Sequence, residues 1–152
     1  MPEELKVTKI EHGTVIDHIR PGLAPQVLNI LGIDRDFPST VIVAMNVQSL
    51  RHQSKDIVKV ENQILDKQEM NKIAIISPNA TINIIQGFEV IEKRKVTLPH
   101  ELIGIAKCPN RNCITNHEAI ESFFIVECEA PLELRCHYCE DLFGEDRVEI
   151  YR

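Results

Sequence analysis

The sequence lacks the features that mark several classes of protein. No apolar run approaches the roughly 18 residues that a membrane-spanning helix requires. The six glycines are scattered, so neither the phosphate-cradling glycine loop nor the dinucleotide-binding glycine fingerprint is present. The acidic start, Met1-Pro2-Glu3-Glu4, has no apolar core of a signal peptide. These absences predict a cytoplasmic protein that has no membrane partner, and any phosphate site must use side chains.

Charge divides the 152 residues into two parts. Residues 1–99 contain 12 of the 17 Lys and Arg and 12 of the 23 Asp and Glu, so this part is neutral. Residues 100–152 contain the other 5 basic and 11 acidic residues, a net charge of −6, together with all five cysteines. The change near Pro99 predicts two domains, residues 1–99 and 100–152. One domain with an acidic end is the alternative.

Hydrophobic periodicity predicts a different architecture for each part. In the first part, strands are expected over 15–19, 40–47, 56–60, 81–85 and 88–96, after an extended segment over 5–10. One helix is expected over 23–31, and another begins at Asp66 and ends before Pro78-Asn79. This order predicts an α+β fold, a ferredoxin-like antiparallel sheet with two helices. The second part shows short strands alone, at 103–107, 123–128, 132–135 and 148–151, and predicts a small all-β, zinc-ribbon-like domain.

Local signals mark the helix ends. Gly32 follows the first helix, where a left-handed residue commonly ends a helix. Asp66 and Glu69 have the spacing of a capping box, with Asp in place of Ser or Thr. Leu65 and Met70 are placed for a hydrophobic staple across that helix start.

The cysteines form two short hooks. Cys108 and Cys113 are separated by four residues, Cys136 and Cys139 by two, and 22 residues lie between the hooks. Two such hooks supply the four tetrahedral thiolates that structural zinc prefers. A domain of this size buries little apolar surface, so a structural metal that stabilises it is expected. Four cysteines leave no open coordination position, which favours structure over catalysis.

Other readings of the cysteines and histidines are weaker. A redox dithiol at Cys136 and Cys139 would leave the first hook unexplained. Cys128 is spare and is expected to be a small core residue. His117 and His137 could replace a ligand if one hook cysteine were idle. A nucleic-acid role, as in zinc-ribbon transcription accessory proteins, needs basic residues, whereas this part is acidic. A protein-docking surface is the better interpretation.

The first part offers a few candidates for an anion site. Lys59 lies in an otherwise apolar strand, and Lys93-Arg94-Lys95 form a basic cluster. Asp17 and His18 could hydrogen-bond a base or a sugar. Ordinary solvated lysines and a salt bridge at a turn are the simpler alternatives. No set of residues indicates catalysis, so the residues alone predict a non-enzymatic, zinc-containing binding protein.

Several motifs together resemble one family. Gly13-Thr-Val-Ile-Asp-His-Ile19, Lys55-Asp-Ile-Val-Lys-Val-Glu-Asn62, Ala80-Thr-Ile-Asn83 and the two cysteine hooks have the order and spacing of aspartate carbamoyltransferase regulatory chains. The resemblance runs from about Leu5 to the last strand. It implies a non-catalytic subunit that forms regulatory homodimers, docks on the catalytic chain through its zinc domain and links catalytic trimers. It also implies CTP, UTP and ATP as allosteric effectors, giving feedback control of pyrimidine synthesis.

The resemblance also assigns site residues. Asp17 and His18 would contact the sugar and phosphates, and Lys59 and Lys93 would be the central ribose and phosphate contacts. Backbone groups around Lys9 and Ile10 would read the base edge. The other pocket residues would be Val15, Asn83 and Val90, and the zinc ligands Cys108, Cys113, Cys136 and Cys139. In two places the sequence departs from the family pattern: Glu3-Glu4 stand where some members have a basic residue, and Phe88 stands where a tyrosine can occur.

Overall fold

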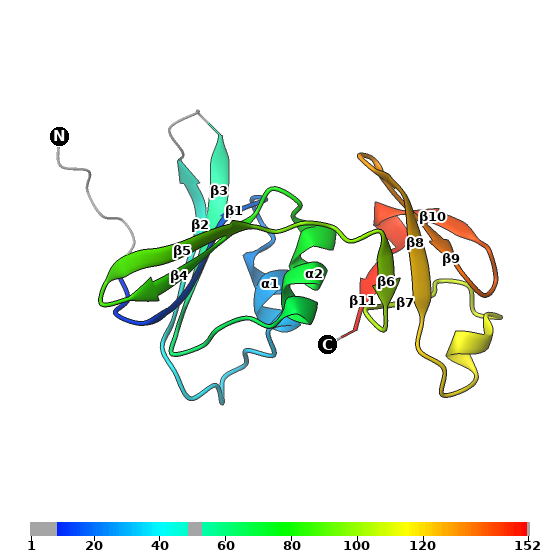
Figure 1. Ribbon diagram of the computed structural model, residues 1–152, viewed down its shortest axis with the longest axis horizontal. Coiled ribbons are helices and arrows are strands. Elements are labelled where there is room, and N and C mark those ends of the chain that lie inside the picture. Colours follow the sequence, from blue (N-terminus) through cyan, green and yellow to red (C-terminus); the bar gives the residue numbers. More distant parts are fainter. Residues whose placement is uncertain (1–8, 49–52, 152) are drawn as a thin grey trace. The chain divides into compact units, whose positions relative to one another are not determined.

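The computed structural model describes residues 9–48 and 53–151, and the chain divides into two compact units between Val96 and Thr97. Glu3, Glu4, Leu5 and the start of the expected extended segment lie outside the described residues. Each unit has its own sheets and its own core (Figure 1). Among the described residues, no helix is both long and apolar enough to cross a membrane.

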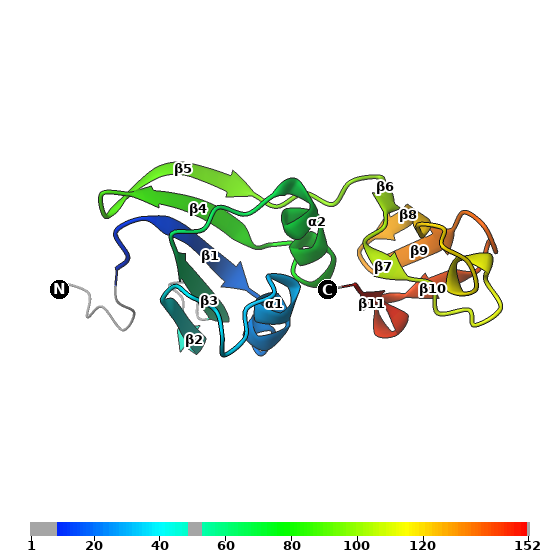
Figure 2. The same cartoon turned by 90° about the horizontal axis from the view of Figure 1, so that it is seen from below.

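The first unit is a five-stranded antiparallel sheet with two helices, as the periodicity predicted. Its strands have the order β2-β3-β1-β4-β5, and both helices lie on one side of the sheet (Figures 1 and 2). The elements are β1 (Gly13–Ile19), α1 (Ala24–Ile30), β2 (Val41–Gln48), β3 (Ser54–Glu61), α2 (Lys67–Ile76), β4 (Thr81–Gln86) and β5 (Glu89–Lys95). The order β2-β3-β1-β4, with helices after β1 and β3, is the ferredoxin-like arrangement, to which β5 adds an edge strand.

The core of this unit lies between the sheet and the helices. Ile16 of β1 is directly opposite Val58 of β3 and Ile82 of β4, and the three side chains are at most 1% exposed. Val27 of α1 and Ile73 of α2 are fully buried as well. Since successive strand residues point to opposite faces, Val15, Lys59 and Asn83 belong to the face without helices.

A buried carboxylate holds the layers together. Asp56 of β3 is 0% exposed and faces the helix layer. One carboxylate oxygen accepts hydrogen bonds from the backbone N–H groups of Gly22 (2.9 Å) and Ala24 (3.0 Å), which stand at the start of α1. The other accepts from the N–H of Asn46 (3.0 Å), at the irregularity in β2. Asp56 thus satisfies three backbone donors, of which the Ala24 bond is buried and the Gly22 and Asn46 bonds are partly buried.

The helix ends follow their local signals. At the start of α2, the Asp66 carboxylate accepts from the N–H of Glu69 (2.7 Å), and the Glu69 carboxylate accepts from the N–H of Asp66 (3.0 Å). This is the predicted capping box. After α1, Gly32 has φ +68° and donates to the Asn29 carbonyl at 3.1 Å, while Ile33 donates to the Leu28 carbonyl at 2.9 Å. These two bonds form a Schellman motif, so the predicted glycine stop is confirmed.

The second unit is all-β, as predicted. A four-stranded antiparallel sheet has the order β10-β9-β8-β6, and β11 pairs with β7. Its strands are β6 (Glu101–Ile103), β7 (Ala106–Lys107), β8 (Phe123–Glu129), β9 (Leu132–Cys136), β10 (Leu142–Gly144) and β11 (Glu149–Ile150). Phe124 and Phe143 meet edge to face in its core, with ring centroids 5.2 Å apart.

Two expectations for this unit were wrong in detail. The strand expected over 103–107 is two strands, because Gly104 has φ +68° and turns the chain between β6 and β7. The short strand β10 was not expected, because its three residues, Leu142-Phe143-Gly144, are too few to show a period.

We predict that Asp56→Ala destabilises the first unit by about 3 kcal/mol or more, because three backbone N–H groups, one buried and two partly buried, lose a charged acceptor. Chemical denaturation of the full chain measures the change. Asp66→Ala is the control, since it removes a single exposed cap that is worth about 1 kcal/mol. Equal losses in the two variants would show that Asp56 does not hold the layers together.

Candidate metal centre and nucleotide-binding face

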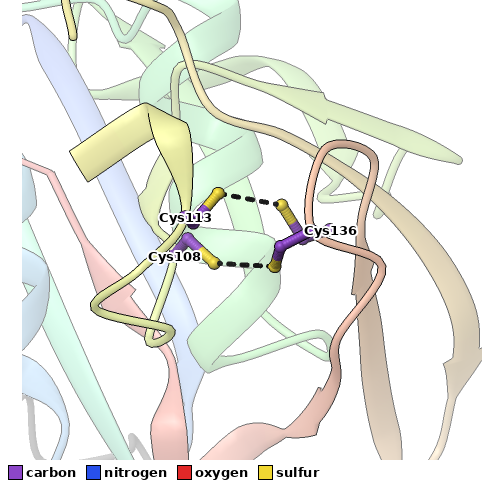
Figure 3. Close-up of side chains that lie close together, drawn as sticks. Cys108, Cys113 and Cys136 are labelled. Carbon is purple, nitrogen blue, oxygen red and sulfur yellow. Dashed lines mark hydrogen bonds between the residues drawn. The ribbon is translucent and has the colours of Figure 1, made fainter. Parts of the chain in front are cut away.

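The two hooks bring four sulfur atoms together. Cys108 follows β7 and Cys113 precedes a short 3-10 turn (Ile114–Asn116), whereas Cys136 ends β9 and Cys139 lies in the turn after it. The four Sγ atoms lie within 4.8 Å of one another, and the pairs Cys108–Cys139 and Cys113–Cys136 are 3.7 Å apart. Figure 3 shows the two sulfurs of the first hook facing the second hook. This cluster of four thiols fits zinc.

Hydrogen bonds shape the first hook. The Asn110 carbonyl accepts from the N–H of Cys113 at 3.0 Å, and the Asn110 side chain accepts from the N–H of Asn112 at 3.0 Å. The Asn116 amide donates to the carbonyls of Cys108 (3.0 Å) and Asn110 (2.7 Å). These bonds close the turn and direct both thiols to the same side.

The second hook is closed mainly by its backbone. The N–H of Glu140 donates to the Cys136 carbonyl at 2.9 Å, and the N–H of Cys136 donates to the Asp141 carbonyl at 3.0 Å. Glu140 has φ +66°, a left-handed conformation that reverses the chain directly after Cys139. The two thiols of this hook therefore also point to one side.

The thiols differ in acidity. Burial raises the pKa of Cys108 and of Cys136, because a thiolate loses solvation inside the protein. Burial acts in the same direction on Cys113, but hydrogen bonds from the hydroxyl and the backbone of Thr115 lower the pKa of Cys113 to about 7. A divalent cation would offset the repulsion of four thiolates and hold all of them ionised.

The other candidate metal ligands stand apart from this cluster. Cys128 lies on β8 and is not among the four clustered thiols. It is half-buried, whereas we expected a core residue. His117 Nε2 lies 2.8 Å from the Arg111 carbonyl oxygen, and His137 stacks on Phe123 with ring centroids 4.6 Å apart. The four hook cysteines remain the predicted ligand set.

In the first unit, the residues suspected of nucleotide binding form a row. Val15 of β1 is directly opposite Lys59 of β3 on one side and Asn83 of β4 on the other, and Asn83 is directly opposite Lys93 of β5. Directly opposed residues in antiparallel strands share a face. The row therefore crosses four strands on the face without helices. Val90, opposite Ile85, lies on the same face, because Ile85 is two residues after Asn83.

Asp17 and His18 lie at one side of this row. Asp17 is two residues after Val15, and its Oδ1 forms an ion pair with Lys55 Nζ at 3.0 Å. His18 has φ +57° where β1 loses register with β3, and its Nδ1 is 3.2 Å from Thr81 Oγ1. Sequence reasoning missed Lys55 as part of this face. Its four-residue spacing from Lys59 on one strand was the available signal.

Burial and two charged groups influence the pKa of Lys59. Burial lowers the pKa of Lys59, because the ammonium ion loses solvation, and Lys9 lowers it further, whereas Asp17 acts in the opposite direction. Lys9 is exposed, whereas Ile10 is only 2% exposed and keeps its side chain in the core. Two lysines and Asp17 thus interact electrostatically on a partly buried surface, where an added anion would stabilise the charged form of Lys59.

Comparisons with known proteins identify the family of the chain. The aspartate carbamoyltransferase regulatory chain, allosteric domain, matches residues 5–97, and the metal binding domain of the same regulatory chain matches residues 100–149. The chain belongs to the aspartate carbamoyltransferase regulatory chain family. The metal binding match includes all four clustered cysteines, so a structural metal is supported for this regulatory chain.

Curated relatives are similar over nearly their whole length. The chain is 49% identical to the aspartate carbamoyltransferase regulatory chain of Thermococcus kodakarensis over 148 residues, 97% of both chains. It is 51% identical to the regulatory chain of Methanothermobacter thermautotrophicus over 149 residues, 97% of this chain and 95% of the relative. It is 47% identical to that of Methanopyrus kandleri over 146 residues, 95% of this chain and 93% of the relative.

The metal centre can be tested by metal content and thiol reactivity. We predict one zinc per chain by elemental analysis, and alkylation of Cys128 alone while the metal is bound, because coordinated thiolates are shielded. Removing zinc with a chelator should expose all five thiols and unfold the second unit. Four unprotected hook thiols in the metal-loaded protein would contradict the centre.

Proposed function

We propose that the chain is a non-catalytic regulatory subunit of aspartate carbamoyltransferase. Residues 1–99 bind nucleoside triphosphates, and residues 100–152 form a structural zinc domain that docks on the catalytic chain. Two regulatory chains pair, and these dimers link catalytic trimers. The family membership supports the regulatory role. The observation that carries the nucleotide proposal is the row Lys59, Val15, Asn83 and Lys93 across four strands.

The row matches the chemistry of a nucleotide. Lys59 and Lys93 are separated by two strands, so their ammonium groups can contact ribose and phosphate groups from both sides of a bound ligand. Asn83 between them offers an amide that both donates and accepts hydrogen bonds. Val15 and Val90 give apolar surface for the sugar or base, and backbone groups near Lys9 and Ile10 read the base edge. Asp17 and His18 contact the sugar and phosphates from the adjoining position.

CTP and ATP compete for this face as effectors, and UTP acts together with CTP. Their triphosphates are alike, so the size and edge pattern of the base decide how each nucleotide biases the chain. Allostery requires that an effector bind two global states with different affinity. A coupling of about 1–3 kcal/mol is typical, and the zinc domain passes it to the catalytic chain. The result is feedback control of pyrimidine synthesis.

Zinc has a structural part in this proposal. Cys108, Cys113, Cys136 and Cys139 hold the ion, which supplies folding free energy to the small domain and no step of catalysis. Nucleic acid is a poor alternative partner, because residues 100–152 carry a net charge of −6 and would repel phosphates. The docking partner is therefore a protein.

Nucleotide binding is tested by calorimetric titration of CTP, then ATP, into the zinc-loaded full chain. We predict saturable, competitive binding. Lys59→Ala and Lys93→Ala should each weaken affinity about tenfold or more, because a charge-assisted contact is lost. Arg94→Ala is the matched control for Lys93, since Arg94 is adjacent on β5, points to the other face and pairs with Glu92. An equal loss in all three variants would point to general electrostatics and against this site.

Assembly depends on the zinc domain. We predict that Cys113→Ala unfolds this domain and abolishes capture of the chain by the catalytic trimer, whereas Cys128→Ala, outside the cluster, is captured like the wild type. A pull-down with the catalytic trimer and zinc analysis of both variants measure this. Normal assembly of Cys113→Ala would remove zinc from the docking proposal.

A further inference from the structure

Thr115 lies beside the metal cluster without belonging to it. Its side chain is buried (7% exposed), and its hydroxyl donates a hydrogen bond to Cys113 Sγ at 3.2 Å. A buried hydroxyl group without an acceptor would cost free energy, and burial also removes the water that would compete with sulfur for this hydrogen bond. The contact therefore links a side chain outside the ligand set directly to one of the four sulfurs.

The short turn after Cys113 sets this contact. The N–H of Asn116 donates to the Cys113 carbonyl at 2.9 Å, and the N–H of His117 donates to the Ile114 carbonyl at 3.0 Å. The Asn116 amide also holds the carbonyls of Cys108 and Asn110. Ile114 is 44% exposed, so the turn directs Ile114 outward and Thr115 toward the sulfur. A β-branched residue is stiff at χ1, which keeps the hydroxyl in place.

We infer that Thr115 is a positioning residue for the metal: its hydroxyl holds and stabilises the Cys113 thiolate. This inference rests on the proposed zinc site and adds to it a residue outside the ligands. Four thiolates around one divalent cation leave a net charge of about −2. A hydrogen bond to sulfur spreads part of that negative charge and fixes the direction of the ligand. Partners of this kind commonly change metal affinity about 10- to 100-fold.

Three variants of the full chain separate the hydroxyl from the rest of the side chain. Thr115→Val keeps the shape and removes the donor, and Thr115→Ser keeps the donor. Ser122→Ala is the matched control, because Ser122 is 1% exposed in the same unit and its hydroxyl has no hydrogen-bond partner in the described structure. Zinc affinity is measured by competition with a chromophoric chelator. Thermal unfolding at saturating zinc shows whether each variant folds.

We expect Thr115→Val to bind zinc about tenfold or more weakly, and Thr115→Ser and Ser122→Ala to stay within about twofold of the wild type. Cobalt(II) gives a second readout that does not depend on stability. Losing a hydrogen bond raises the energy of the sulfur electrons, so the sulfur-to-cobalt charge-transfer band of Thr115→Val should move to longer wavelength. The bands of the other two variants should not move.

Two results would overturn the inference. One is wild-type affinity and an unmoved cobalt band in Thr115→Val. The other is an equal loss in Thr115→Ser, which would assign the effect to packing of the methyl group. Failure of the wild-type chain itself to bind zinc or cobalt is a different result, because it would overturn the proposed metal site as well.

Discussion

Four sulfur atoms within 4.8 Å of one another constrain everything else in the second unit. As thiolates they repel, and as buried thiols they form only weak hydrogen bonds, so their convergence calls for a cation. The turn bonds of Asn110 and Asn116 and the left-handed Glu140 all serve to aim sulfur inward. Because a unit of this size buries only a small core, it depends on its hooks for much of its stability.

The first unit depends on strand register instead. In β3, Asp56 and Val58 point into the helix layer, while Lys55 and Lys59 point to the face without helices. One strand therefore serves both the core and the candidate site. A slip of one residue would move the lysines into the core and the Asp56 carboxylate out of reach of α1. The register that holds the helices is thus also what aligns the row of site residues.

Sequence reasoning succeeded where the signal was local. The capping box of Asp66 and Glu69, the glycine stop at Gly32 and the two hooks each lie within a few residues, so spacing alone predicted them. It failed at Gly104 and at β10, because very short strands are defined by their partners rather than by a period. The row of site residues depends on pairing across four strands. The residues alone marked its lysines as candidates but left solvated side chains as the simpler alternative, and the family resemblance gave Lys59 and Lys93 their roles.

The Lys93 end of that row lies on the least buried strand of the sheet. Strand β5 is an edge strand, all seven of its residues are exposed, and it carries Lys93. Edge strands with little buried apolar surface open locally at low free-energy cost. A ligand that contacts both Lys59 and Lys93 would have to hold β5 against that opening, which takes up part of its binding free energy. The strength of a nucleotide contact would then depend on how firmly β4 holds β5, and substitutions along this hairpin that touch no ligand could tune the response to effectors.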